Sequence, residues 1–194
     1  FKKRLAFSTV SQVSYILLGI AMFGPMGTIG GLVHLVHQGI MKITMFFCAG
    51  NVAETLHLHK ISELKGVGRR LPLTMGAFTV AALGMIGVPP LAGFVSKWHL
   101  GLGAIESGHP WILAVLAASS LLNAAYFLPI LRTVWFDQPD TPWPAPEGGR
   151  RLEASWWLLV PPLATALLTI LVGLLGGSVL SPIHWAYLVV GREY

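Results

Sequence analysis

The sequence predicts an all-α fold, a polytopic transmembrane helix bundle of about six spans that includes one interrupted helix. Hydrophobic residues make up 54% of the chain and charged residues 11%, whereas a soluble domain carries roughly 25% charged residues. The mean hydropathy is +0.68, and apolar segments long enough to cross a bilayer recur along the chain. We therefore expect a multi-pass protein of the cell (plasma or inner) membrane, with the lipid bilayer as its surroundings.

Composition also argues against several functions. The formal net charge of +5 is spread along the chain, so nucleic acid is not an expected partner. The single cysteine, Cys48, excludes an internal disulfide. His57 and His59 stand two residues apart and would point in different directions on a helix, so no metal site is predicted. The chain begins FKKRLAF without an initiator methionine, which we interpret as a fragment of a longer protein.

The first predicted span covers residues 5–24 and the second covers residues 28–50. The first opens with polar side chains that can hydrogen-bond neighbouring helices, namely Ser8, Thr9, Ser11, Gln12 and Ser14. Such side chains favour a helix that faces protein rather than lipid.

The second span carries a polar stripe of His34, His37, Gln38 and Lys42. On an ideal helix these four residues fall within an arc of roughly 140° and extend along about 12 Å of the axis. A lone histidine in an apolar helix is usually a satisfied core residue. Four polar side chains on one side instead indicate a buried, hydrogen-bonded chain.

Residues 51–70 are too polar to span a membrane, and we expect an extramembrane loop with a short amphipathic helix. A third span, residues 71–88, ends at the paired prolines Pro89 and Pro90. A fourth, shorter span covers residues 91–105.

The fourth span contains Lys97, followed by Gly101 and Gly103. An ionisable residue inside a bilayer is by default a functional site. The alternative is a lysine that snorkels to the headgroups beside Trp98, and this segment alone leaves both open. We expect the helix to lose regular hydrogen bonding between Lys97 and Gly103, because unwound backbone at depth is tolerated inside protein or beside water.

The fifth span, residues 111–135, places four polar side chains near mid-depth: Ser119, Ser120, Asn123 and Tyr126. They could hold bridging waters or serve helix packing. Residues 136–154 are rich in proline and charge, which predicts an aqueous loop. Residues 155–194 are expected to form a peripheral transmembrane helix, residues 155–179, and a tail.

Basic residues cluster before the first span and between the second and third. A path of six spans puts both clusters on one side, which the positive-inside rule would make cytoplasmic. The same path puts Arg150 and Arg151 on the other side, so the sequence leaves the orientation open.

Three segments together resemble one family: KKRLAFSTVSQVSY over residues 2–15, HLVHQGIMK over residues 34–42, and GVPPLAGFVSKW over residues 87–98. They are similar to the antiporter-like membrane subunits of respiratory complex I, membrane-bound hydrogenases and Mrp-type sodium/proton antiporters. The SKW ending, with lysine rather than glutamate, looks closer to the Mrp type. By this resemblance, residues 1–135 would match the second of two inverted five-helix repeats.

The resemblance implies a role for individual residues. Lys97 matches the proton-relay lysine on the interrupted helix, and Lys42 matches the lysine on the histidine-bearing helix. Either His37 or His34 matches a relay histidine, because the His-x2-His-x4-Lys spacing here departs from the common His-x3-His-x3-Lys pattern. Gln38 and the polar residues of the fifth span would support the relay.

The resulting expectation is proton translocation by one subunit of a multisubunit complex whose other membrane subunits are its partners. No residue set resembles a quinone, flavin or iron–sulfur site, so no cofactor and no catalytic residue are predicted. Any redox chemistry of an NADH–quinone oxidoreductase or hydrogenase-type complex would belong to other subunits. The alternatives are a sodium/proton antiporter subunit without redox coupling, and a structural membrane subunit that conducts nothing.

Overall fold

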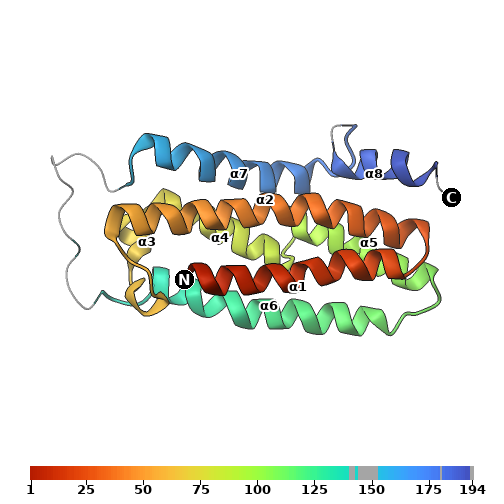
Figure 1. Ribbon diagram of the computed structural model, residues 1–194, viewed down its shortest axis with the longest axis horizontal. Helices are drawn as coiled ribbons and strands as arrows, with labels where there is room; N and C mark the ends of the chain where they lie inside the picture. The colour runs from red at the N-terminus through yellow and green to blue at the C-terminus, as the bar shows by residue number, and fades with distance from the viewer. Residues whose placement is uncertain (140–142, 144–152, 180, 193–194) are drawn as a thin grey trace.

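The computed structural model describes residues 1–139, 143, 153–179 and 181–192. Within these residues all regular structure is helical, and the long helices lie lengthwise beside one another (Figure 1). Four helices are long and apolar enough to cross a membrane: α1 (Lys2–Ala21), α2 (Pro25–Leu56), α6 (Ile112–Trp135) and α7 (Trp156–Leu174). The predicted all-α, multi-pass membrane bundle is therefore confirmed.

Helix α2 is the centre of the bundle, and α1, α5 and α7 all pack against it. Its 32 residues extend further than the predicted span, because the helix continues through Leu56 before His57 ends it in a left-handed conformation. Helix α7 lies on the outer side of α2, opposite α1 and α6 (Figure 1). Most of the buried hydrophobic side chains form one core between α2, α4, α6 and α7, in which α6 packs against α4.

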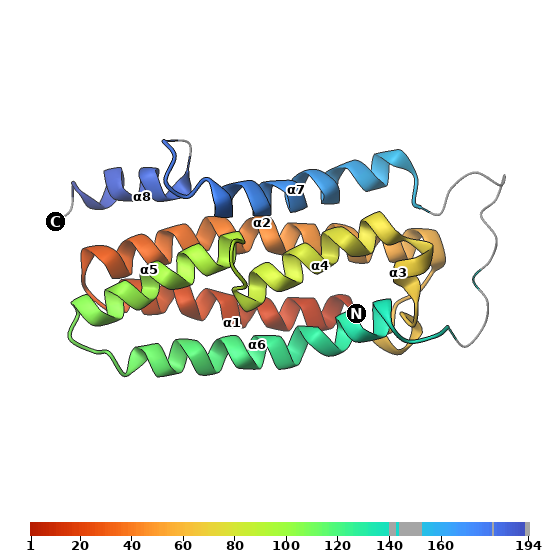
Figure 2. The ribbon, with the colours of Figure 1, turned by 180° about the vertical axis from the view of Figure 1, so that it is seen from behind.

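The predicted third and fourth spans form one interrupted crossing. Helices α4 (Pro72–Ile86) and α5 (Ala92–Glu106) have 15 residues each, about 22 Å of helix, which is less than a hydrocarbon core of about 30 Å. They lie end to end along the bundle (Figure 2). Their contacts with α2 show the same end-to-end arrangement. Gly84 of α4 lies beside Met41 in the second half of α2, whereas Gly103 of α5 lies beside Gly27 at the start of α2.

The interruption itself lies between Ile86 and Ala92, not between Lys97 and Gly103 as the sequence suggested. Helix α4 ends at Ile86, and Gly87 follows with a φ of 96°, a conformation that suits glycine. Pro89 and Pro90 follow and have no backbone N–H with which to continue the ladder.

Gly101 and Gly103, the expected site of loosening, both lie inside the regular helix α5. Gly103 serves close packing, because a Cβ atom there would come within 2.5 Å of the backbone of Gly27.

The polar residues of α1 that were predicted to face protein differ in their burial. Ser8 and Gln12 are buried against the bundle, whereas Ser11 and Ser14 are exposed on the outside of this chain. The described part of this chain does not cover these last two residues, so for them the expectation that the span faces protein stays a prediction.

The polar connections gather at one end of the bundle. A 3-10 turn η1 (Ile61–Glu63) and the short helix α3 (Val67–Arg70) follow α2. Two hydrogen bonds tie this segment to the rest of the chain. The Phe1 amino group donates to the His59 carbonyl, and the Gly66 N–H donates to the Thr133 carbonyl. At the same end the Glu153 carboxylate accepts hydrogen bonds from the first turn of α4. The greater part of the predicted aqueous loop, residues 140–142 and 144–152, lies outside the described residues.

The other end of the bundle holds the α1–α2 and α5–α6 turns. There the Glu106 carboxylate accepts a hydrogen bond of 2.9 Å from the Met26 N–H at the start of α2. The last helix, α8 (Pro182–Val190), packs its Ile183 and Ala186 on Ile29 and Val33 of α2.

Candidate functional site

The predicted polar stripe of α2 lies in the interior of the chain. His34 and His37 are fully buried, and Gln38 and Lys42 are 8% and 6% exposed. Burying four polar side chains in one helix is costly unless they are hydrogen-bonded, so their partners define the site. Those partners come from α1 and α5.

Lys97 is anchored at the helix interruption. Its Nζ atom donates to the carbonyls of Met85 at 3.2 Å and Ile86 at 2.9 Å. In a continuous helix these two carbonyls would accept from the N–H groups four residues later, at positions 89 and 90. Both positions are proline and have no N–H. The paired prolines therefore free the two carbonyls that hold the Lys97 ammonium group at the negative end of the α4 dipole.

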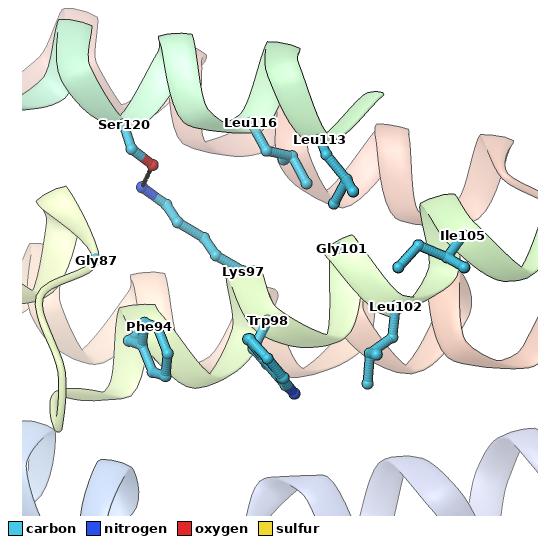
Figure 3. A pocket seen from close by; sticks show the side chains of 10 residues that line it. All are labelled: Gly87, Phe94, Lys97, Trp98, Gly101, Leu102, Ile105, Leu113, Leu116 and Ser120. Carbon is cyan, nitrogen blue, oxygen red and sulfur yellow. Dashed lines mark hydrogen bonds between the residues drawn. The ribbon is translucent and has the colours of Figure 1, made fainter. Parts of the chain in front are cut away.

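The third Lys97 partner belongs to α6. Its Nζ atom donates to the Ser120 hydroxyl at 3.0 Å, and it lies 5.1 Å from the centre of the Tyr15 ring. A cavity of about 400 Å³ adjoins this site between α5 and α6, and its lining is apolar apart from Lys97 and Ser120 (Figure 3). The alternative of a lysine that reaches to the headgroups does not fit these contacts, because all three point into the bundle.

A continuous set of hydrogen bonds crosses from α6 through α1 to α2. The Tyr15 hydroxyl donates to Ser119 Oγ at 2.6 Å, and Asn123 Nδ2 donates to the Tyr15 hydroxyl at 3.4 Å and to the Ser119 carbonyl at 3.0 Å. Gln12 Nε2 donates to Asn123 Oδ1 at 3.3 Å, and Gln12 Oε1 lies 3.1 Å from His34 Nε2. This line joins the surroundings of Lys97 to the α2 stripe.

The two histidines have different surroundings. His34 Nδ1 lies 2.8 Å from the Ser96 hydroxyl, so both of its ring nitrogens have partners. His37 Nδ1 donates to the Ala92 carbonyl at 2.7 Å, at the start of α5, while its Nε2 atom is buried with no partner among the described residues. His34 thus belongs to the hydrogen-bonded line, and His37 ties α2 to the helix that follows the interruption.

Lys42 marks the far end of the stripe. Its Nζ atom donates to the Leu5 carbonyl at 3.1 Å and to the Ser8 hydroxyl. Gln38 lies between His34 and Lys42 on the same helix face, and its Oε1 atom is buried without a partner in the described part of the chain. Among those described residues, both lysines are held by carbonyl and hydroxyl oxygens rather than by a carboxylate.

Three residues differ from the sequence prediction. Tyr126 lies apart from the line: its hydroxyl donates to the Arg4 carbonyl, and the Arg4 guanidinium lies 4.4 Å from its ring centre. Ser96 was missed, although it directly precedes Lys97, because one serine beside a lysine carries no spacing signal. Tyr15 was also missed, although it ends the SQVSY segment.

An interrupted helix with polar groups near the middle of the bilayer is a recurrent device of membrane transport proteins. Residues 1–123 match the family described as the NADH:quinone oxidoreductase/Mrp antiporter transmembrane family, and the chain belongs to that family.

Individual relatives come from both kinds of complex. NADH-quinone oxidoreductase subunit N of Desulforudis audaxviator is 39% identical over 186 residues, with 92% of this chain and 37% of the relative covered. A structure of the Mrp complex from Dietzia sp. superposes with a TM-score of 0.82 at 28% identity, over 94% of this chain and 41% of the other. Respiratory complex I from Thermus thermophilus gives a TM-score of 0.83 at 23% identity, with 99% and 39% covered. This chain thus spans about two fifths of the length of these relatives, and its closer resemblance to the Mrp type stays a prediction.

Proposed function

We propose that this chain is a proton-translocating part of a longer membrane subunit, and that the subunit works within a multisubunit complex alongside other membrane subunits. The observation that carries the proposal is the pair of buried lysines, Lys97 and Lys42, each held by neutral oxygens. Hydroxyl, amide and imidazole groups join Tyr15, whose ring centre lies 5.1 Å from Lys97 Nζ, to His34, which shares a face of α2 with Lys42. We assign residues 1–135 to the second antiporter-like repeat and α7 to the helix that follows it.

The chemistry of the titratable side chains in the site suits protons. A lysine can exchange its proton, and histidine titrates near physiological pH. Hydroxyl groups both donate and accept, whereas the amides of Gln12 and Asn123 orient their neighbours without carrying a proton. The names of the relatives fit this proposal, since one belongs to an NADH-quinone oxidoreductase and one to an Mrp complex.

Sodium exchange is the second candidate function. A carboxylate inside a span would indicate a sodium path, because carboxylate and carbonyl oxygens suit hard cations. Among the described helices the nearest candidates, Glu54 and Glu106, lie near helix ends, and Glu106 is engaged by the Met26 N–H. The described part of the chain therefore supports protons over sodium.

Replacing Lys42 by methionine tests the proposal. The variant keeps the length of the side chain but removes its proton, so we expect proton transport by the assembled full-length complex to fall roughly a hundredfold, within the range for losing a proton-transfer group. The measurement is proton flux in proteoliposomes with and without sodium, with Lys2→Met at an exposed position as the control. Unchanged flux with impaired assembly would favour the structural role, and flux that requires sodium would favour exchange.

The interrupted crossing also bears on the orientation that the sequence left open. With α4 and α5 as one crossing, α6 ends and α7 begins at the end of the bundle where α1 begins (Figure 1). By sequence, Arg150 and Arg151 belong to the α6–α7 connection, outside the described residues. The end that this connection joins also carries eight other basic residues: Lys2, Lys3, Arg4, Lys60, Lys65, Arg69, Arg70 and Arg132. We propose that this side is cytoplasmic.

Single-cysteine labelling tests the orientation. In a Cys48→Ser background, we expect a membrane-impermeant maleimide added to intact cells to label His109→Cys and to leave Ser62→Cys unlabelled. Both positions are exposed in this chain. Opening the cells should make Ser62→Cys reactive, which provides the control for its accessibility. Labelling of Ser62→Cys in intact cells would reverse the assignment.

A further inference from the structure

We propose that His34 takes up and releases the transported proton only at Nδ1, and that the Ser96 hydroxyl is the positioning group that makes this exchange feasible. In the same arrangement, Gln12 and Asn123 keep the opposite ring nitrogen permanently protonated. The inference rests on the proposed proton translocation and adds the atom at which one relay residue works.

A backbone carbonyl of α6 fixes the direction of every hydrogen bond in the line. The Ser119 carbonyl can only accept, so the side-chain group of Asn123 that lies 3.0 Å from it must be the NH2 group. Asn123 Oδ1 therefore faces Gln12, and the group of Gln12 that lies 3.3 Å from it must be the donor Nε2. Gln12 Oε1 then faces His34 Nε2 at 3.1 Å. Because that oxygen can only accept, His34 Nε2 carries a hydrogen in every protonation state.

The remaining ring nitrogen, Nδ1, is the variable one, and it faces Ser96. The Ser96 Oγ atom lies 2.8 Å from His34 Nδ1 and 3.2 Å from the Gly93 carbonyl. A hydroxyl has one hydrogen and can accept as well as donate. Its hydrogen can therefore point at one of these two neighbours at a time.

These two orientations match the two states of the imidazole. When His34 is neutral, the Ser96 O–H donates to the Nδ1 lone pair. When a transported proton is bound at Nδ1, the new N–H donates to Ser96 Oγ, and the Ser96 hydrogen turns to the Gly93 carbonyl. The transported proton arrives from a protonated water of the transport path, so one O–H bond of that donor breaks as the N–H bond forms at Nδ1, and every polar atom named keeps a partner in both states.

Because the site is buried, His34 depends on the rotation of the Ser96 hydroxyl for a hydrogen-bond partner at Nδ1. Ser96, His34 and Gln12 are fully buried, and Asn123 is 6% exposed, so bulk water does not replace a lost partner. Without the Ser96 hydroxyl, the neutral ring would present a buried lone pair without a donor, and the imidazolium a buried N–H without an acceptor. Both states would be disfavoured, and the charged one more strongly.

The first test compares transport by two Ser96 variants in the full-length protein within its complex. We expect Ser96→Ala to lower proton flux at least tenfold, and Ser96→Thr, which keeps a hydroxyl, to recover most of it. Ser107→Ala, at the end of the same helix, is the matched control and should transport like the wild type. Equal loss in the alanine and threonine variants, or full activity of Ser96→Ala, would overturn the inference.

The second test needs no Ser96 variant. The 15N NMR spectrum of histidine-labelled, full-length protein in its complex should show neutral His34 as the Nε2–H tautomer, identified by its loss in His34→Gln. Gln12→Met should release this constraint and populate the Nδ1–H form. A wild-type Nδ1–H tautomer would overturn the inference while leaving the proposed function intact, whereas normal transport by Lys42→Met would count against the function alone.

Discussion

Replacing Lys97 by arginine is expected to reduce proton transport by the assembled complex roughly a hundredfold, nearly as far as Lys97→Ala, because a proton-transfer group is lost in both cases. Arginine can keep the positive charge beside the Met85 and Ile86 carbonyls that now hold the lysine. It cannot release its proton at any accessible pH. If Lys97 relays protons, transport should therefore stop in the arginine variant. If Lys97 serves only as a fixed charge, transport should continue.

The measurement is proton flux in proteoliposomes, normalised to the amount of assembled complex. Lys2→Arg, on the exposed side of α1, controls for the general effect of exchanging the two cations. Retention of most of the flux by Lys97→Arg would show that Lys97 is a static counter-charge for the end of helix α4. Loss of assembly in Lys97→Ala alone would show that the charge also stabilises the fold.

The sequence was sufficient for features that depend on local periodicity. The positions of His34, His37, Gln38 and Lys42 share one side of a helix of 3.6 residues per turn, and all four are buried in the structure. The sequence also pointed to broken helix hydrogen bonds near Lys97. Their location was wrong because Gly101 and Gly103 were interpreted as helix-loosening residues, although glycines in membrane helices also serve close packing.

The connections between helices could not be predicted in the same way. The hydrogen bonds from Asn123 to Gln12 and from Gln12 to His34 join three helices, and no spacing within one segment encodes them. The orientation could not be predicted for a related reason. Two apolar segments of 15 residues look like two short spans in the sequence, and only their end-to-end arrangement shows that they make one crossing (Figure 2).

The position of the interruption can be tested by placing alanine at two glycines of α5. A Cβ atom on Gly93 would overlap the Gly84 carbonyl oxygen, which is backbone and cannot move aside. We expect Gly93→Ala to force α4 and α5 apart and to destabilise the protein by about 3 kcal/mol, at the upper end for overpacking. The measurement is thermal unfolding of the full-length protein in detergent, together with the yield of assembled complex.

Gly101→Ala is the matched control, because the nearest atom to its new Cβ would be the end of the flexible Leu113 side chain at 3.2 Å. Alanine favours a helix over glycine by about 1 kcal/mol, so this variant should unfold at or above the wild-type temperature and keep its proton flux. A regular helix at this position tolerates alanine, whereas a segment that must unwind for transport does not. If Gly101→Ala lost transport while Gly93→Ala kept it, the working interruption would lie beyond Lys97, and the carbonyls freed by Pro89 and Pro90 would not be the ones that matter for the relay.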